Sequence, residues 1–138
     1  MNRSSVYDCS VIELDCHSSD RRGNMSVVEN GKSIPFDVRR VYYLYDVPGG
    51  VERGGHAHRS LYQLIIAVSG SFSVTLDDGK LKRTVFLNRP NRGLLVVPGL
   101  WRTIEDFSSG AVCMVLASSE YDEEDYIRDY GSFLNLKN

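Results

Sequence analysis

The 138-residue sequence lacks several features that would each indicate a class of protein. The N-terminal residues include no apolar core of a signal peptide, and no apolar run approaches the length of a membrane span, so we expect a cytoplasmic protein without membrane contact. Cysteine occurs only three times, at spacings that form neither a metal site nor a redox pair, and we expect reduced thiols. With 16 basic and 18 acidic residues, the chain also lacks the positive charge of a general nucleic-acid-binding protein.

Lysine is scarce as well, because 12 of the 16 basic residues are arginine. Arginine is the side chain best suited to a bidentate grip on phosphate or carboxylate, although genome composition can produce the same bias. Six of the 18 acidic residues lie between Glu120 and Asp129, which leaves residues 1–119 with two more basic than acidic residues. An arginine-rich body followed by an acidic segment favours a small anionic ligand over a polymer.

The apolar residues, at 42% of the chain, are enough for the core of one domain, which we place at residues 1–138. They occur in short β-branched and aromatic stretches separated by turns, a pattern typical of strands. We predict strands at 41–47, 61–68, 72–76, 82–87, 94–97, 102–107 and 111–117, with a hairpin turn at 77–79. About eight to ten strands at such regular spacing predict an all-β sandwich or barrel over about residues 6–117.

The pattern changes at Tyr121, where we predict a short C-terminal helix over about residues 122–135. Asp122 can cap such a helix, and the acids at 123–125 suit the positive end of its dipole. Apolar side chains then recur at helical spacing, at Tyr126, Ile127, Tyr130 and Phe133. We expect the acidic cluster to be solvated and the helix to pack on the outside of the barrel.

Two of the three histidines, His56 and His58, are one residue apart and follow a glycine-rich stretch. Positions i and i+2 of a strand face the same side, so both imidazoles should point together into the interior of the barrel. The pair could ligate a metal, or one or both could act as a general acid or base, because imidazole titrates near neutral pH. The third histidine, His17, stands alone, and we assign it no role.

The segment around the histidine pair resembles the first motif of the cupin family. In this chain the motif consists of Gly50, His56, His58, Gln63 and Gly70. Metal-binding cupins have glutamate at the position of Gln63 and a further histidine in a second motif, which corresponds here to residues 93–102. This chain has no histidine after His58. The resemblance implies a single cupin (jelly-roll) β-barrel, and the two missing ligands argue against a bound metal.

Further segments narrow the resemblance to one family. They are 40–43 (RVYY), 53–58 (RGGHAH), 76–79 (LDDG), 106–109 (DFSS), 115–118 (VLAS) and 121–130 (YDEEDYIRDY). Over nearly the whole chain they resemble the dTDP-4-oxo-6-deoxyglucose 3,4-ketoisomerases of the WxcM-like group. The resemblance implies a homodimeric isomerase, with strands exchanged between subunits, that needs neither metal nor cofactor. Such an enzyme moves the ketone of a dTDP-sugar from C4 to C3, in the biosynthesis of 3-amino-3,6-dideoxy sugars for lipopolysaccharide or S-layer glycans.

That reaction needs a base that removes the C3 proton, a stabiliser of the enediolate and a proton donor. We take His58 as the principal base and His56 as its assistant, although the roles could be reversed. One of the consecutive tyrosines must face inward and could donate a hydrogen bond to a sugar oxygen, and we count Tyr43 among the catalytic candidates. The candidates for substrate binding are Arg22, Arg40, Tyr42, Arg53, Arg59, Gln63, Trp101 and Arg102.

The binding candidates differ in where they stand relative to the histidine pair. Arg53 and Arg59 flank the histidine pair and are our first choices for the diphosphate. Arg102 stands where some family members have histidine. Gln63 is five residues after the second histidine and would face away from the site on an ideal strand, so only a bulge or bend would bring it back. Trp101, the only tryptophan, could stack on thymine or close the barrel.

Two other classes of function remain open from the sequence. One is a metal-dependent cupin enzyme, which the histidine pair favours and Gln63 opposes. The other is a non-catalytic cupin that binds nucleotide sugars. A 3- or 3,5-epimerase of a similar sugar is a neighbouring alternative, because it would use a comparable base but return the proton to the carbon that it left.

Overall fold

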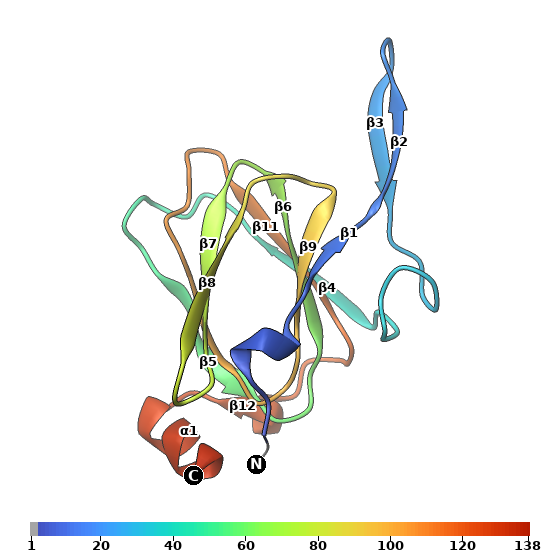
Figure 1. Ribbon diagram of the computed structural model, residues 1–138. Coiled ribbons are helices and arrows are strands. Elements are labelled where there is room, and N and C mark those ends of the chain that lie inside the picture. The colour runs from blue at the N-terminus through green and yellow to red at the C-terminus, as the bar shows by residue number, and fades with distance from the viewer. Residues whose placement is uncertain (1–2) are drawn as a thin grey trace.

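The computed structural model describes residues 3–138, which form two β-sheets, a projecting hairpin and a C-terminal helix (Figure 1). The strands are β1 (Val11–Glu13), β2 (Asp15–Ser19), β3 (Gly23–Val27), β4 (Arg40–Leu44), β5 (Arg53–His58), β6 (Gln63–Ser69), β7 (Phe72–Asp77), β8 (Lys82–Leu87), β9 (Arg92–Val96), β10 (Trp101–Glu105), β11 (Val112–Ala117) and β12 (Tyr126–Ile127). The helical elements are the 3-10 turns η1 (Val6–Asp8) and η2 (Glu123–Asp125) and the α-helix α1 (Tyr130–Lys137). No helix in this part of the chain is long and apolar enough to cross a membrane.

The strands are distributed over two five-stranded sheets in an order that crosses repeatedly from one to the other. One sheet has the order β1-β9-β6-β11-β4, the other β12-β5-β10-β7-β8, and the paired strands within both are antiparallel. Sequence neighbours such as β5 and β6 therefore lie in opposite sheets, as in a jelly roll. The predicted all-β fold is confirmed, and the strands at 72–76 and 82–87 fall almost where the sequence pattern places them.

The main core lies between the two sheets and is built from inward-facing side chains of both. On β7, Phe72 and Val74 are fully buried, which confirms the alternation predicted from the sequence. A second cluster covers the outer face of the first sheet, where Leu64 and Ile66 pack under apolar side chains of the segment 28–38. This sheet is therefore apolar on both faces, which explains why β6 reads as an unbroken apolar run.

The predicted helix over residues 122–135 is wrong in its first half. Asp122 caps only the short turn η2, after which the chain extends into β12 and pairs with β5. Asp129 then caps α1, which ends at Lys137. Ile127 and Phe133 are both buried in one cluster, although only Phe133 lies on the helix. Because strand and helix bury side chains on the same cluster, their apolar spacing imitates one longer amphipathic helix. The helix lies at one end of the barrel, outside the space between the sheets (Figure 1).

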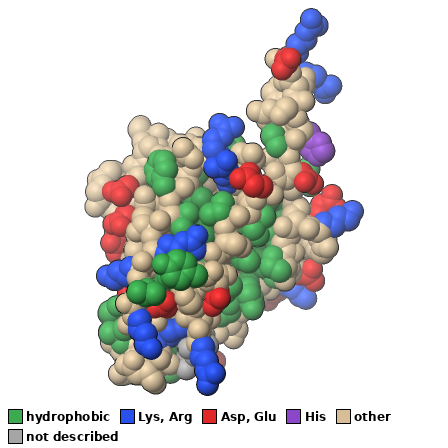
Figure 2. Space-filling model, viewed as in Figure 1, with side chains coloured by type: hydrophobic (Ala, Val, Ile, Leu, Met, Phe, Trp, Pro, Cys, Tyr) green, Lys and Arg blue, Asp and Glu red, His purple; other side chains and the backbone are tan. Residues whose placement is uncertain are grey.

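The hairpin formed by β2 and β3 was not predicted, and it projects from the body of the molecule (Figures 1 and 2). Its strands pair with each other over five residue pairs, and neither strand belongs to one of the large sheets. Almost all of its side chains are exposed, including that of Met25. Arg21 and Arg22 lie in the turn that joins its strands.

Candidate active site

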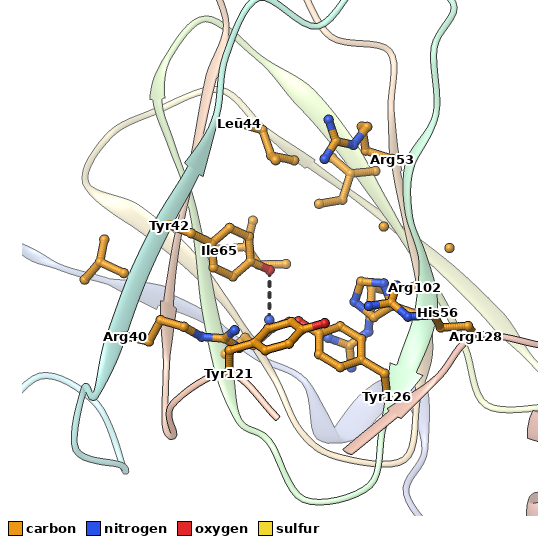
Figure 3. A pocket seen from close by; sticks show the side chains of 15 residues that line it. Arg40, Tyr42, Leu44, Arg53, His56, Ile65, Arg102, Tyr121, Tyr126 and Arg128 are labelled. Carbon is orange, nitrogen blue, oxygen red and sulfur yellow. Dashed lines mark hydrogen bonds between the residues drawn. The ribbon is translucent and has the colours of Figure 1, made fainter. Parts of the chain in front are cut away.

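A cavity of about 490 Å³ opens between the sheets, at the end of the barrel that the segment 121–128 crosses (Figure 3). Its volume is in the range of small-molecule sites. It is lined by side chains of β4, β5, β6 and β10 and of the segment after β11. The lining residues are Arg40, Val41, Tyr42, Leu44, Arg53, Gly54, Gly55, His56, Gln63, Ile65, Arg102, Ile104, Tyr121, Tyr126 and Arg128.

His56 is the histidine that lines the cavity. It lies on β5, opposite Arg102 of β10, and its side chain is only partly buried. Burial, together with the neighbouring Arg102 guanidinium and His58, lowers the pKa of His56 to about 3. The imidazole is therefore neutral around pH 7, which is the form that can accept a proton.

His58 lies behind His56 and is fully buried. The two rings meet edge to face, with 4.8 Å between their centroids, so they share one face of β5 as predicted. His58 Nδ1 lies 3.0 Å from Oδ2 of Asp125, whose other oxygen accepts the backbone N–H of Ser60 at 2.8 Å. Burial and the Arg102 charge lower the pKa of His58, so the neutral ring donates its Nδ1 hydrogen to Asp125 and leaves Nε2 unprotonated. His58 Nε2 is buried and has no hydrogen-bond partner among the described residues.

Arg102 is a fully buried cation at the inner end of the cavity. Burial lowers the pKa of Arg102 to about 10, which still leaves it charged at neutral pH. Its guanidinium donates to the carbonyl oxygen of Leu100 and, at 2.5 Å, to Oε1 of Gln63. Gln63 Nε2 donates in turn to Tyr42 Oη at 3.0 Å. Within residues 3–138 no carboxylate forms an ion pair with Arg102, so its charge is free to act on a bound ligand.

Three further arginines surround the opening. Arg40 lies over the rings of Tyr42 and Tyr121, 5.5 Å from each centroid, and its buried Nε has no partner among the described residues. Arg128 lies 4.3 Å from the ring centroid of Tyr126 and is paired with Glu123. Arg53 lines the cavity from the start of β5. The opening thus combines cationic and aromatic side chains, which suits an anionic ligand with a planar ring.

The cavity brings together six of the residues selected from the sequence: Arg40, Tyr42, Arg53, His56, Gln63 and Arg102. Gln63 reaches it without a bulge in β5, because the chain turns after His58 and Gln63 begins a strand of the opposite sheet. The expectation that Gln63 faces away from the site is therefore wrong, because it assumed that His58 and Gln63 lie on one continuous strand.

The remaining candidates lie elsewhere in this chain. Tyr43 faces the outside of β4 with 59% of its surface exposed, since Tyr42 takes the inward position. Arg59 is exposed beyond the end of β5, and Arg22 lies in the turn of the projecting hairpin. Trp101 alternates with the inward-facing Arg102 and packs against α1, with ring contacts to Tyr130 and Phe133. That packing favours the structural role of Trp101 over stacking on a base.

The segment 121–128 contributes to the site, which was not predicted from the sequence. We expected its acids to be a solvated helix start, whereas Asp125 contacts His58, and Tyr121, Tyr126 and Arg128 line the cavity. The YDEEDYIR block, which resembles the family, was the available signal, although a linear sequence does not show that β12 pairs beside the histidines. Among residues 3–138, no group of three or more His, Cys, Asp or Glu side chains is arranged to hold a metal ion.

Comparisons with known proteins give a consistent result. The family model described as FdtA, WxcM-like, C-terminal, matches residues 7–138. The chain is 47% identical over 114 residues to a TDP-4-oxo-6-deoxy-alpha-D-glucose-3,4-oxoisomerase of Aneurinibacillus thermoaerophilus, covering 83% of this chain and 82% of the relative.

Solved structures that resemble this chain are also 3,4-ketoisomerases. A 3,4-ketoisomerase from Helicobacter canadensis superposes with a TM-score of 0.91 at 42% identity, covering 94% of this chain and 97% of that one. A mutant 3,4-ketoisomerase from Thermoanaerobacterium thermosaccharolyticum, in complex with TDP-4-keto-6-deoxyglucose, superposes with a TM-score of 0.93 at 35% identity over 96% of each chain. Since the family model covers all but the first six residues, the chain belongs to the FdtA (WxcM-like, C-terminal) family.

Proposed function

We propose that the protein is a sugar-nucleotide 3,4-ketoisomerase that converts dTDP-4-oxo-6-deoxyglucose into its 3-oxo isomer. The observation that carries the proposal is the imidazole of His56 in a cavity whose inner end holds Arg102, a buried cation with no carboxylate partner among residues 3–138. Relatives of the same family carry the 3,4-oxoisomerase name, and one of them binds TDP-4-keto-6-deoxyglucose. The 3-oxo product has the carbonyl that an aminotransferase needs to make a 3-amino-3,6-dideoxy sugar.

In this proposal His56 is the base, which reverses the order of roles that we took from the sequence. The C3–H bond is acidic because it is adjacent to the C4 ketone, and its proton passes to the neutral ring of His56. The electron pair forms the C3–C4 double bond, and negative charge moves to the oxygen on C4. His58 lies behind His56, fully buried and hydrogen-bonded to Asp125, and supports its position by ring contact.

The second half of the reaction completes the proton balance. The oxygen on C4 gains a proton, the hydroxyl on C3 loses one, and C4 receives a proton so that the ketone stands at C3. Arg102 supplies positive charge that stabilises the enediolate in a site screened from water. Tyr42 faces the cavity and supplies a hydroxyl donor for a sugar oxygen (Figure 3). No electrons leave the sugar, so the reaction requires no redox cofactor.

We assign the diphosphate to the arginines at the opening, above all to Arg40 and Arg53. Neither forms an ion pair with a carboxylate within residues 3–138. Arg128 shares its charge with Glu123 and contributes less. The rings of Tyr121 and Tyr126 offer surfaces for the thymine.

The donor set does not suit a metal-dependent cupin. The amide oxygen of Gln63, at the position where metal-binding cupins have a glutamate ligand, is engaged with Arg102. A guanidinium at this point repels a divalent cation. We therefore retain the prediction that neither metal nor cofactor is needed. A cytoplasmic location and the single domain of residues 1–138 remain part of the proposal.

The homodimer also belongs to this proposal, and the hairpin β2–β3 supports it. A two-stranded hairpin without other contacts is marginally stable in water, so a covering surface is expected. The exposed apolar side chains of Val41, Tyr43 and Tyr45, on and just after β4, offer such a surface. We propose that a second copy of the chain exchanges this hairpin, which would carry Arg22 toward the partner's cavity and cover Tyr43.

The experiment is a turnover assay with purified protein and dTDP-4-oxo-6-deoxyglucose, followed by NMR. The proposal expects a 3-oxo product from wild-type protein, undiminished after treatment with a chelator. It expects that His56→Asn lowers turnover by about 10²–10⁴-fold while dTDP still binds. Binding of dTDP-sugar without turnover would instead show a binding module, and activity that the chelator abolishes and Fe, Mn or Zn restores would show a metal enzyme.

A further inference from the structure

Three side chains at the inner end of the cavity are joined by successive hydrogen bonds, each donated by one side chain to the next. Arg102 donates to Gln63, and Gln63 donates to Tyr42. We propose that Gln63 is a positioning residue, which holds the hydroxyl of Tyr42 so that its hydrogen points into the cavity, toward the sugar oxygen that becomes negatively charged. This inference rests on the proposed ketoisomerase function and adds a role that neither the histidines nor the arginines provide.

The orientation of the Gln63 amide follows from the chemistry of its neighbour. A guanidinium has only donors, so the amide atom that faces Arg102 Nη1 at 2.5 Å must be the oxygen Oε1. The amide nitrogen Nε2 therefore faces Tyr42 Oη, 3.0 Å away, and a nitrogen of an amide can only donate there. Both Arg102 and Gln63 are almost completely buried, at 1% exposure each, which holds this arrangement in place.

The consequence for Tyr42 is a defined direction of its own hydrogen. Because the phenolic oxygen accepts from Gln63, its hydrogen must be donated to another acceptor. No such acceptor for Tyr42 is found among residues 3–138, and the ring points into the cavity that also contains His56 (Figure 3). Burial raises the pKa of Tyr42 above its ordinary value, against smaller opposing effects of Arg102 and Gln63, so the hydroxyl stays protonated at neutral pH.

The backbone explains how the two side chains meet. Tyr42 lies opposite Val115 on β11, and Gln63 lies opposite Ala117 on the other side of the same strand. Val115 and Ala117 are both buried and two residues apart, so their partners Tyr42 and Gln63 share the inner face of the first sheet. An amide is suited to this position because it accepts at one end and donates at the other. A carboxylate would accept from both neighbours, withdraw the tyrosine hydrogen from the cavity and neutralise Arg102.

The test is a double-mutant cycle with two substitutions at position 63. Gln63→Glu reverses the hydrogen bond to Tyr42, and the neutral Gln63→Met removes it, so an effect common to both does not arise from charge. We expect each to lower kcat by about tenfold or more, with the Kd for dTDP unchanged within about twofold. In the Tyr42→Phe background, we expect Gln63→Met to lower kcat by no more than about twofold further, because the hydroxyl that it acts on is absent. Gln63→Glu should still lower kcat there by neutralising Arg102, but by a smaller factor than when the hydroxyl is present. Asn88→Asp makes the same amide-to-acid change on an exposed loop and should have no effect.

The outcomes separate this inference from the function on which it rests. If wild-type protein does not isomerise the sugar, the proposed function fails and the inference fails with it. If wild-type protein is active and either Gln63 variant keeps full kcat, only the inference is overturned. It is also overturned if both variants lower kcat by the same factor with and without the Tyr42 hydroxyl. Circular dichroism and dTDP binding identify any variant that does not fold, and the other substitution then decides.

Discussion

At the scale of single residues, the two histidines differ far more than their spacing suggests. The sequence places His56 and His58 on one face of a strand, and the structure confirms that their rings touch. Only His56 reaches the cavity, because His58 is fully buried behind it and hydrogen-bonded to Asp125. That distinction depends on a residue 67 positions later in the chain, which no local pattern could indicate.

The substitution Asp125→Asn tests the hydrogen bond between Asp125 and His58. The carboxylate accepts from His58 Nδ1 and from the backbone N–H of Ser60, whereas an asparagine oxygen can satisfy only one of them. We expect a loss of about 1–3 kcal/mol in the free energy of unfolding, measured with urea, and a decrease of kcat. Asp122→Asn is the matched control, because Asn caps a helical turn about as well as Asp, and its cost should stay within about 0.5 kcal/mol. Equal effects of the two substitutions would contradict the role of Asp125.

The lowered histidine pKa values predict how stability depends on pH. In the folded state the pKa of His56 is about 3, against 6.5 for an ordinary histidine in an unfolded chain. Below pH 6.5 the unfolded chain binds a proton that the folded chain does not, so this stability is present above pH 6.5 and is lost as the pH falls toward 3. We expect His56→Asn to reduce the slope of unfolding free energy between pH 6 and 4 by about 1 kcal/mol per pH unit. His17→Asn, on the exposed hairpin, should leave the slope unchanged, and identical slopes in all three proteins would refute the prediction.

At the scale of elements, the sequence predicts strands better than it predicts the C-terminal segment. Alternating or unbroken apolar runs identify β6, β7 and β8 closely, because their burial depends on neighbours in the same sheet. The segment 122–135 misleads because Ile127 on a strand and Phe133 on a helix fill one cluster. The hairpin β2–β3 has no apolar pattern to reveal it, since nearly all of its residues are exposed.

The turn between β6 and β7 offers a test at this scale. Gly70 has a φ of +66°, and a Cβ there would lie 2.8 Å from the backbone of Ala111. Gly70→Ala combines a left-handed backbone with a clash against main chain, and we expect it to lower the free energy of unfolding by about 3 kcal/mol. Gly110→Ala has a similar φ of +73° but open space around the new methyl, so we expect a loss of about 1 kcal/mol. Thermal or urea unfolding that ranks the two variants equally would contradict the packing argument.

At the scale of the whole molecule, the fold class and half of the site could be predicted from sequence. Strand spacing predicts the barrel, and the His-x-His pair indicates where its chemistry lies. What could not be predicted is the set of contacts that closes the site, such as the segment 121–128 across the opening and the link from Arg102 through Gln63 to Tyr42. The contact between Arg102 and Gln63 joins the two opposite sheets, and the segment 121–128 crosses the opening between them, so both depend on how the whole barrel closes.

The exchanged dimer predicts that inactive variants can complement each other. If Arg22 acts in the partner's cavity, Arg22→Ala and His56→Asn remove different halves of each site. Each variant alone should show little activity, whereas co-refolding equal amounts should restore about a quarter of the wild-type activity, because half of the dimers are mixed and one of their two sites is intact. Sedimentation measures the dimer directly. A monomeric active protein, or no recovery on mixing, would contradict the exchange.

Deuterium incorporation during turnover in deuterium oxide tests the proposed isomerisation most directly. Wild-type protein is incubated with dTDP-4-oxo-6-deoxyglucose, and the recovered sugars are assigned by NMR. Proton transfer through an enediol predicts solvent deuterium at C4 of a 3-oxo product, and at C3 of any substrate that returns from the intermediate. A 4-oxo sugar that carries deuterium only at C3 or C5 with inverted configuration would show an epimerase. Complete absence of both deuterium and 3-oxo product would contradict the ketoisomerase function outright.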